Sequence, residues 1–202
     1  SRSALSKVDT WSAYVQDQVE LASFLQVVAG VRYDEFRIAA TDRIKGTGAQ
    51  RTDRKWSPRF GLLLKPRPEM SFYASFTRSF LPQSGDQFGA LDATQATLAP
   101  ERFENLEAGV KWDINPGLAF TAAVYQLDRE NSRFNNPVTG LPELSGKTRA
   151  KGIELQLAGR VLPQLQTSIG YTLQDGEVRS QTTAAPAGRK LAQLPRERKS
   201  VV

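Results

Sequence analysis

The chain has 202 residues, a mean hydropathy of −0.42 and a formal net charge of +6. It contains neither Cys nor His, which excludes disulfides, thiol chemistry, Cys/His zinc sites and Ser-His-Asp triads. No stretch approaches the roughly 18 apolar residues that a membrane-spanning helix needs, although barrel strands would escape this test because their residues alternate. The positive charges are spread along the chain, apart from RERK at 196–199, so nucleic acid is not expected as a partner.

Alternation of apolar and polar residues predicts eight β-strands of about ten residues in four hairpins. In chain order they span 12–21, 25–34, 56–65, 70–80, 103–113, 118–130, 147–161 and 165–174. The pattern is clearest at 103–113, where Leu106 and Val110 share one face while Glu107 and Lys111 share the other. Residues 199–202 are typical of the start of a further strand.

The connections between these strands alternate strictly between short and long. Short turns are expected at 22–23, 66–69, 115–117 and 162–164, and long loops at 41–54, 81–101, 131–146 and about 175–195. Loops of this length are uncommon in compact soluble domains but are expected on one side of an outer-membrane barrel. A β-propeller is disfavoured, because a blade would need four short strands in each repeat, which instead holds two long strands and a loop. A soluble sandwich is disfavoured because the polar face of each strand suits a wet lumen better than a dry core.

Several blocks resemble, in family order, the TonB-dependent siderophore receptors. They are YVQDQ at 14–18, GVRYD at 30–34, SPRFGL at 57–62, SFYASFTRSF at 71–80, LAPE at 98–101, ENLEAGVKW at 104–112, AAVY at 122–125 and LSGKTRAKGIEL at 144–155. No single block is specific, but the ordered set covers nearly the whole chain. The last block is most similar to the catecholate branch of the family.

The resemblance implies an all-β fold, an antiparallel transmembrane β-barrel of 22 strands around a plug, with short periplasmic turns and long extracellular loops. Residues 1–202 would supply about eight of these strands, without the plug domain, the TonB box or the C-terminal strand. The expected location is the outer membrane of a Gram-negative bacterium. The expected partners are a ferric siderophore, outer-membrane lipid, and the TonB complex through the missing N-terminal region.

The resemblance also implies transport rather than catalysis, so no catalytic residue and no protein ligand to a metal is expected. No cofactor is expected either, since the iron arrives already chelated by the siderophore. Ferric catecholates are anionic and aromatic, which favours arginine and aromatic side chains near the outer mouth. The candidates for ligand binding are Arg78, Phe80, Arg133, Phe134 and Arg149.

Two further groups of residues have expected positions in such a barrel. We expect Glu107, Lys111, Glu154 and Gln156 to face the lumen, where they would contact the plug or neighbouring side chains. We expect Tyr33, Trp56, Trp112 and Tyr171 to anchor the barrel at the membrane interface.

Two alternatives to a ferric siderophore receptor remain open. One is a TonB-dependent receptor for another cargo, such as cobalamin or a glycan. The other is a small, self-contained eight-stranded barrel with a structural or adhesive role.

Overall fold

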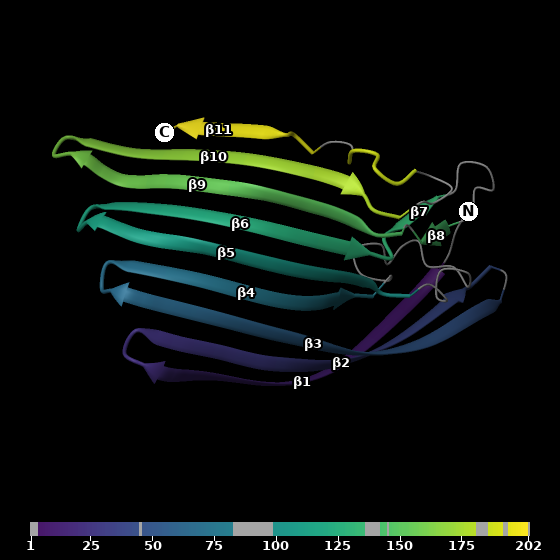
Figure 1. The fold of residues 1–202 in the computed structure, drawn as a ribbon. Helices are drawn as coiled ribbons and strands as arrows, with labels where there is room; N and C mark the ends of the chain where they lie inside the picture. The colour runs from purple at the N-terminus through teal and green to yellow at the C-terminus, as the bar shows by residue number, and fades with distance from the viewer. Residues whose placement is uncertain are drawn as a thin grey trace.

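The computed structural model describes residues 4–44, 46–82, 99–135, 142–144, 146–180, 186–191 and 194–201. Within these ranges the chain forms β-strands and no helix (Figure 1). The strands are β1 (Ala4–Ala22), β2 (Leu25–Asp42), β3 (Thr47–Arg67), β4 (Met70–Leu81), β5 (Glu101–Asn115), β6 (Leu118–Glu130), β7 (Arg133–Asn135), β8 (Pro142–Leu144), β9 (Thr148–Leu162), β10 (Leu165–Val178) and β11 (Glu197–Val201). Nine of them form one antiparallel sheet in the order β1-β2-β3-β4-β5-β6-β9-β10-β11, and β7 pairs with β8.

All eight predicted strands are present, as β1 to β6, β9 and β10, and β11 confirms the strand expected near the C-terminal end. Six of them are longer than predicted, whereas β6 and β9 keep their predicted lengths of 13 and 15 residues. The prediction of a long loop at 41–54 is wrong, because β2 continues to Asp42 and β3 begins at Thr47. Polar residues cover both faces of this hairpin, so alternation is lost although backbone pairing continues.

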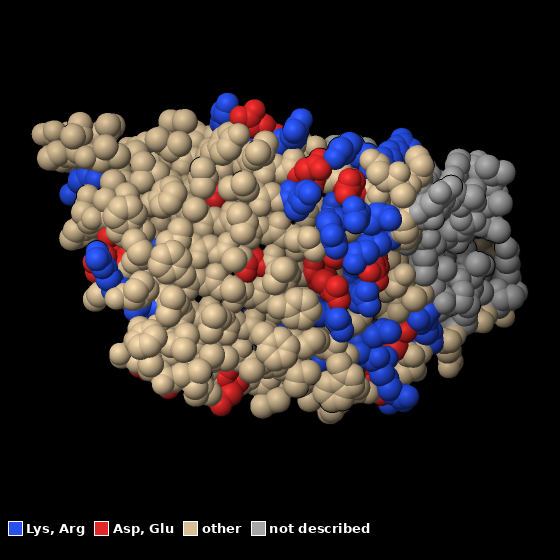
Figure 2. Space-filling model, in the orientation of Figure 1, with Lys and Arg blue, Asp and Glu red and all other residues tan. Residues whose placement is uncertain are grey.

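The register of the sheet separates two faces of opposite character. Ala108 of β5, Val124 of β6 and Ile153 of β9 lie directly opposite one another, and Val124 is 52% exposed. We call this side the apolar face; it continues through β1 to β4 and β10. The alternate residues, such as Glu107 and Glu154, form the polar face. Figure 2 shows a broad surface almost free of charged side chains, bordered by a belt of Lys, Arg, Asp and Glu.

The sheet has almost no core of its own. Among the described residues, the buried apolar side chains are Ile38 and Ala123, whereas many large apolar side chains of the apolar face are exposed. A continuous apolar surface of this extent marks a contact with another protein or with a membrane. No helix of the described chain is long and apolar enough to cross a membrane.

The sheet is open rather than closed. Its edges are β1 and β11, and no pairing joins these two strands within the described residues. The alternative of a small, self-contained eight-stranded barrel is therefore wrong for this structure. The sheet also opens locally: β3 pairs with β4 only from Arg59 to Arg67, although β3 starts at Thr47 and β4 continues to Leu81.

Candidate functional site

A hollow of about 610 Å³ lies where β3 and β4 separate, at the end of the sheet away from the short turns. That volume is within the range of small-molecule sites in proteins. The residues that line it come from the first four strands and from Pro82, which follows β4: Tyr14, Val15, Gln16, Val31, Arg32, Asp34, Phe36, Ser57, Pro58, Arg59, Thr77, Arg78, Ser79, Phe80, Leu81 and Pro82. Three arginines and three aromatic rings therefore surround one space.

Cationic side chains at this hollow are held in place by their neighbours. Arg32 donates hydrogen bonds to Asp34 (2.8 Å) and to the hydroxyl of Ser12 (2.8 Å). The ring of Phe80, which lines the hollow, has the ammonium of Lys55 5.5 Å from its centre, within the range of a cation–π contact. Because the guanidinium of Arg32 is half exposed, it keeps donors available for a bound anion.

The structure brings two of the five predicted ligand-binding residues together. Arg78 and Phe80 both line the hollow, whereas Arg149 lies on β9, apart from it. Arg133 and Phe134 belong to β7, but their side chains lie outside the described residues. The assignment of all five to ligand binding stays a prediction. Arg32 and Arg59 were missed, because only the separation of β3 from β4 places them beside Arg78.

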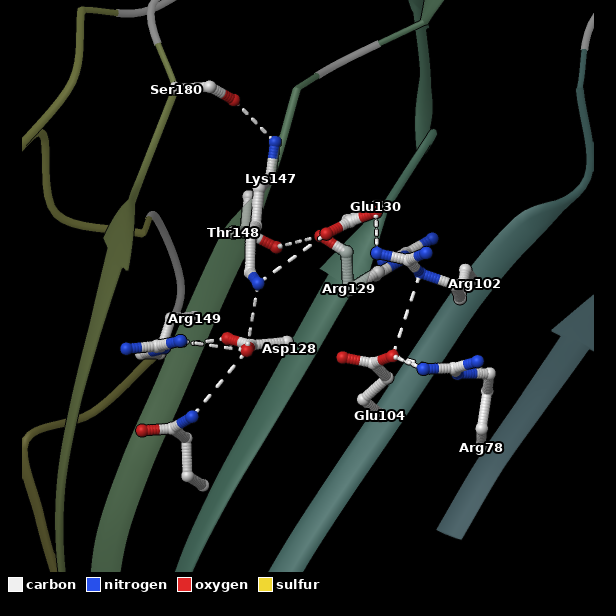
Figure 3. A network of polar contacts seen from close by, with 11 residues as sticks. Arg78, Arg102, Glu104, Asp128, Arg129, Glu130, Lys147, Thr148, Arg149 and Ser180 are labelled. Atoms are coloured by element: carbon white, nitrogen blue, oxygen red, sulfur yellow. Dashed lines mark hydrogen bonds and ion pairs between the residues drawn. The ribbon is translucent and has the colours of Figure 1, made fainter. Parts of the chain in front are cut away.

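Arg78 and Arg149 also belong to a network of ion pairs on the apolar face (Figure 3). Arg78 is 2.7 Å from Glu104, which also lies 3.9 Å from Arg102. Asp128 is held between Arg149 (2.6 Å) and Lys147 (3.1 Å). Glu130 joins the two halves, because it pairs with both Arg102 and Lys147. The network thus runs without a break from β4 to β9.

The four residues expected in the lumen lie on the polar face, and all four lie around Tyr73. Its hydroxyl donates to Glu107 (2.6 Å), and the Lys111 ammonium is 5.7 Å from its ring centre. Glu154 and Gln156 line the same hollow as Tyr73 and Glu107. Whether this face borders a lumen stays a prediction.

Two tyrosines of the polar face were missed in the sequence, and each lies against a glycine of the next strand. Tyr73 is paired with Gly109, and Tyr125 is paired with Gly152. A Cβ at either glycine would lie within 3.0 Å of the tyrosine ring or hydroxyl, so the ring fits only because the glycine has no side chain. Because the tyrosine and the glycine of each pair are distant in the sequence, their contact can be recognised only once the register of the strands is known.

The predicted interface anchors occupy the apolar face. Tyr33 lies between Trp56, with ring centres 4.8 Å apart, and Trp11, at 5.8 Å. Trp11 and Trp56 are 62% and 61% exposed, although indole rings are usually buried in soluble proteins. Trp112 and Tyr171 lie on the same face, nearer the short turns. Their role as anchors stays a prediction.

Known proteins match this chain along nearly its whole length. A family model described as TonB dependent receptor-like, beta-barrel matches residues 1–200. The metal-pseudopaline receptor CntO of Pseudomonas aeruginosa is 31% identical over 204 residues, covering 97% of this chain and 28% of that protein. The chain therefore spans little more than a quarter of the length of such relatives.

Solved structures share the fold. The siderophore receptor PiuA from Acinetobacter baumannii superposes with a TM-score of 0.83 at 23% identity, over 97% of this chain and 31% of that structure. The ferric-catecholate import receptor Fiu from Escherichia coli superposes with a TM-score of 0.78 at 21% identity, over 98% of this chain and 32% of that structure.

Proposed function

Because the chain belongs to the TonB-dependent receptor β-barrel family, and so to the bacterial outer membrane, we propose that its protein imports ferric siderophores. The observation that carries the proposal is the match over residues 1–200, in a sheet whose two faces differ as those of a barrel wall do. The related receptors are transport proteins, so no catalytic group is needed. The relatives named as siderophore receptors support this choice of cargo.

In this proposal the two faces have separate tasks. The apolar face contacts outer-membrane lipid, while the polar face, with Glu107, Lys111, Glu154 and Gln156, lines the lumen. Coupling to the TonB complex uses a region of the protein outside this chain. The iron remains held by its chelator, so the barrel wall provides recognition and no cofactor.

The hollow between β3 and β4 is the proposed contact for the cargo. Arg32 and Arg59 reach the hollow from the polar face, whereas Arg78 and Phe80 of β4 reach it from the other side, where β3 and β4 no longer pair. Guanidinium groups bind anionic oxygens with two parallel donors, and they stack on aromatic rings. An anionic aromatic chelate such as a ferric catecholate matches both properties, so we propose the catecholate class first.

A second cargo has a specific observation in its favour. The relative at 31% identity is named as a receptor for metal-pseudopaline rather than for a catecholate. We therefore propose metal complexes of other anionic chelators as the alternative class. Such a cargo would use the arginines of the hollow but would not need the ring of Phe80.

Uptake by a strain that carries the full-length gene and lacks its other iron receptors tests the proposal. Cells receive ⁵⁵Fe bound to a catecholate, to a hydroxamate or to a carboxylate chelator, and a strain without TonB is the control. We expect uptake of the ferric catecholate that disappears without TonB. Uptake of none of these complexes would overturn the proposal, and TonB-dependent uptake of a non-catecholate complex alone would select the alternative cargo.

A further inference from the structure

Arg59 differs from the other two arginines of the hollow in its partners. Arg32 is 2.8 Å from Asp34, and Arg78 is 2.7 Å from Glu104. Arg59 is exposed, and within the part of the chain that the structure describes no carboxylate lies within ion-pair distance of it. Because a guanidinium has five N–H donors, that of Arg59 keeps its donors for a ligand.

The charge of the hollow is therefore unevenly compensated. Three arginines and one carboxylate, that of Asp34, line it, which gives a formal net charge of +2. Asp34 offsets the charge of Arg32, and Glu104, just outside the lining, offsets that of Arg78. The uncompensated charge of the lining is that of Arg59, so an anion in the hollow is attracted to it more than to the other two arginines.

A glycine gives the stem of Arg59 its position. Gly30 of β2 is paired with Arg59 on one side and with Gln16 of β1 on the other. A Cβ at Gly30 would lie 3.1 Å from the Cβ of Gln16 and 3.2 Å from the Cγ of Arg59, which is closer than ordinary van der Waals contact. The stem of Arg59 thus lies over the backbone of β2 in space that residue 30 leaves open. Gly30 is a positioning residue for Arg59.

The neighbours of Arg59 suit an anionic ligand that also has aromatic rings. Arg59 and Arg32 both reach the hollow from the polar face, and Tyr14 of β1 is paired with Arg32. Tyr14 is 77% exposed, so its ring offers a stacking surface beside the two guanidinium groups. An iron catecholate presents both anionic oxygens and rings to such a wall.

We propose that Arg59 is the specificity-determining residue of the hollow and that it selects iron chelates by their negative charge. Its guanidinium binds anionic oxygens of the chelate, whereas Arg32 and Arg78, which already give donors to carboxylates, contribute less to the affinity. Coulomb attraction grows in proportion to the charge of the ligand, so a more negative chelate gains more from Arg59. This inference rests on the proposed import of ferric siderophores, and it adds the residue and the property of the cargo that this residue recognises.

Binding to the purified full-length receptor in detergent, followed by quenching of tryptophan fluorescence, tests the proposal. The probes are the ferric complex of a hexadentate tris-catecholate, which carries three negative charges, and that of a tetradentate bis-catecholate, which carries one. Arg59→Gln removes the positive charge. Loss of a hydrogen-bonded contact between charged groups lowers affinity about 10- to 100-fold, so the Kd for the tris-catecholate complex should rise by such a factor. The Kd for the bis-catecholate complex should rise by a clearly smaller factor.

Arg160→Gln is the matched control, because it removes the same charge from an exposed arginine near the short turns, away from the hollow. We expect it to bind both complexes as the wild type does. An unchanged Kd in Arg59→Gln, or an equal rise for the two complexes, would overturn this inference and leave the proposed function intact. If the wild type binds neither complex, the proposed catecholate cargo is wrong, and this inference is wrong with it.

Two further variants separate ligand binding from a structural role and keep the proposal testable if Arg59→Gln does not fold. Arg59→Lys keeps the charge but loses the two parallel donors, so its Kd for the tris-catecholate complex should rise by a smaller factor than in Arg59→Gln. Gly30→Ala should also raise this Kd, because the added methyl group displaces the stem of Arg59. The double variant Gly30→Ala/Arg59→Gln should bind as Arg59→Gln does, since both changes act through one guanidinium. Additive effects would contradict the positioning role of Gly30.

Discussion

Replacing Gly109 with alanine tests the close packing of the polar face. A Cβ at this position would lie 2.6 Å from the backbone carbonyl oxygen of Ala122 and 2.7 Å from the ring of Tyr73. The first contact is with the backbone of β6, so rotation of a side chain cannot relieve it. Forcing extra atoms into such a site costs about 1–3 kcal/mol. If Tyr73 also moves away from Glu107, the lost hydrogen bond adds about 1 kcal/mol.

The expected loss for Gly109→Ala is therefore about 2–4 kcal/mol in the free energy of unfolding. The assay is urea unfolding of the full-length receptor in lipid vesicles, with the folded fraction read from its heat-dependent mobility on gels. Gly170→Ala is the control, because a Cβ there would meet nothing within 4 Å, although the residue also lies on the polar face. Alanine should leave stability unchanged there or raise it by up to about 1 kcal/mol, since it restricts the unfolded chain.

Two results would refute this reasoning. If Gly109→Ala unfolds at the same urea concentration as the wild type, the close approach of β5 to β6 and Tyr73 does not exist in the protein. If Gly170→Ala loses as much stability as Gly109→Ala, the loss reflects strand flexibility in general and not the packing of Tyr73.

Other predictions concern the ion pairs of the sheet and the hollow. Asp128→Ala should lower the free energy of unfolding by about 1–2 kcal/mol, because two cations then lose a buried partner. Glu35→Ala should change it little, because the partners of Glu35 are largely exposed. Equal losses of stability in the two variants would contradict this ranking. Arg78→Ala should raise the KM of ferric catecholate uptake about tenfold, as one charge-assisted pair is lost. Phe80→Ala should raise that KM less, and Arg160→Ala, near the short turns, should leave it unchanged. Equal effects of Arg78→Ala and Arg160→Ala on uptake would show that the hollow does not contact the cargo.

The sequence predicted the strands best where one face is apolar and the other polar. The alternation at 103–113 corresponds to β5, which extends only two residues further at each end. The prediction failed at 41–54 because this part of the β2–β3 hairpin is polar on both faces. Cross-strand contacts such as Arg54 to Glu35 (2.8 Å) replace apolar packing there. Local hydropathy carries no information about such pairing.

The sites were harder to predict than the strands, because they depend on which residues lie opposite one another. Glu104, Asp128 and Arg149 are far apart in the sequence and look like isolated charges. The register of β5, β6 and β9 puts them in one row. The hollow beside Arg78 depends in the same way on where β3 stops pairing with β4.

The most direct measurement identifies the face of the sheet that meets lipid, since the proposed division into a lipid face and a lumen face depends on it. Because this chain contains no Cys, single cysteines at 119–127 of β6 can carry a spin label in the full-length receptor, with any cysteine elsewhere replaced. We expect labels at even positions, such as Val124, to collide with oxygen dissolved in the bilayer. Labels at odd positions, such as Thr121, should be shielded from lipid. Equal accessibility at both sets of positions would contradict the division of the sheet into a lipid face and a lumen face.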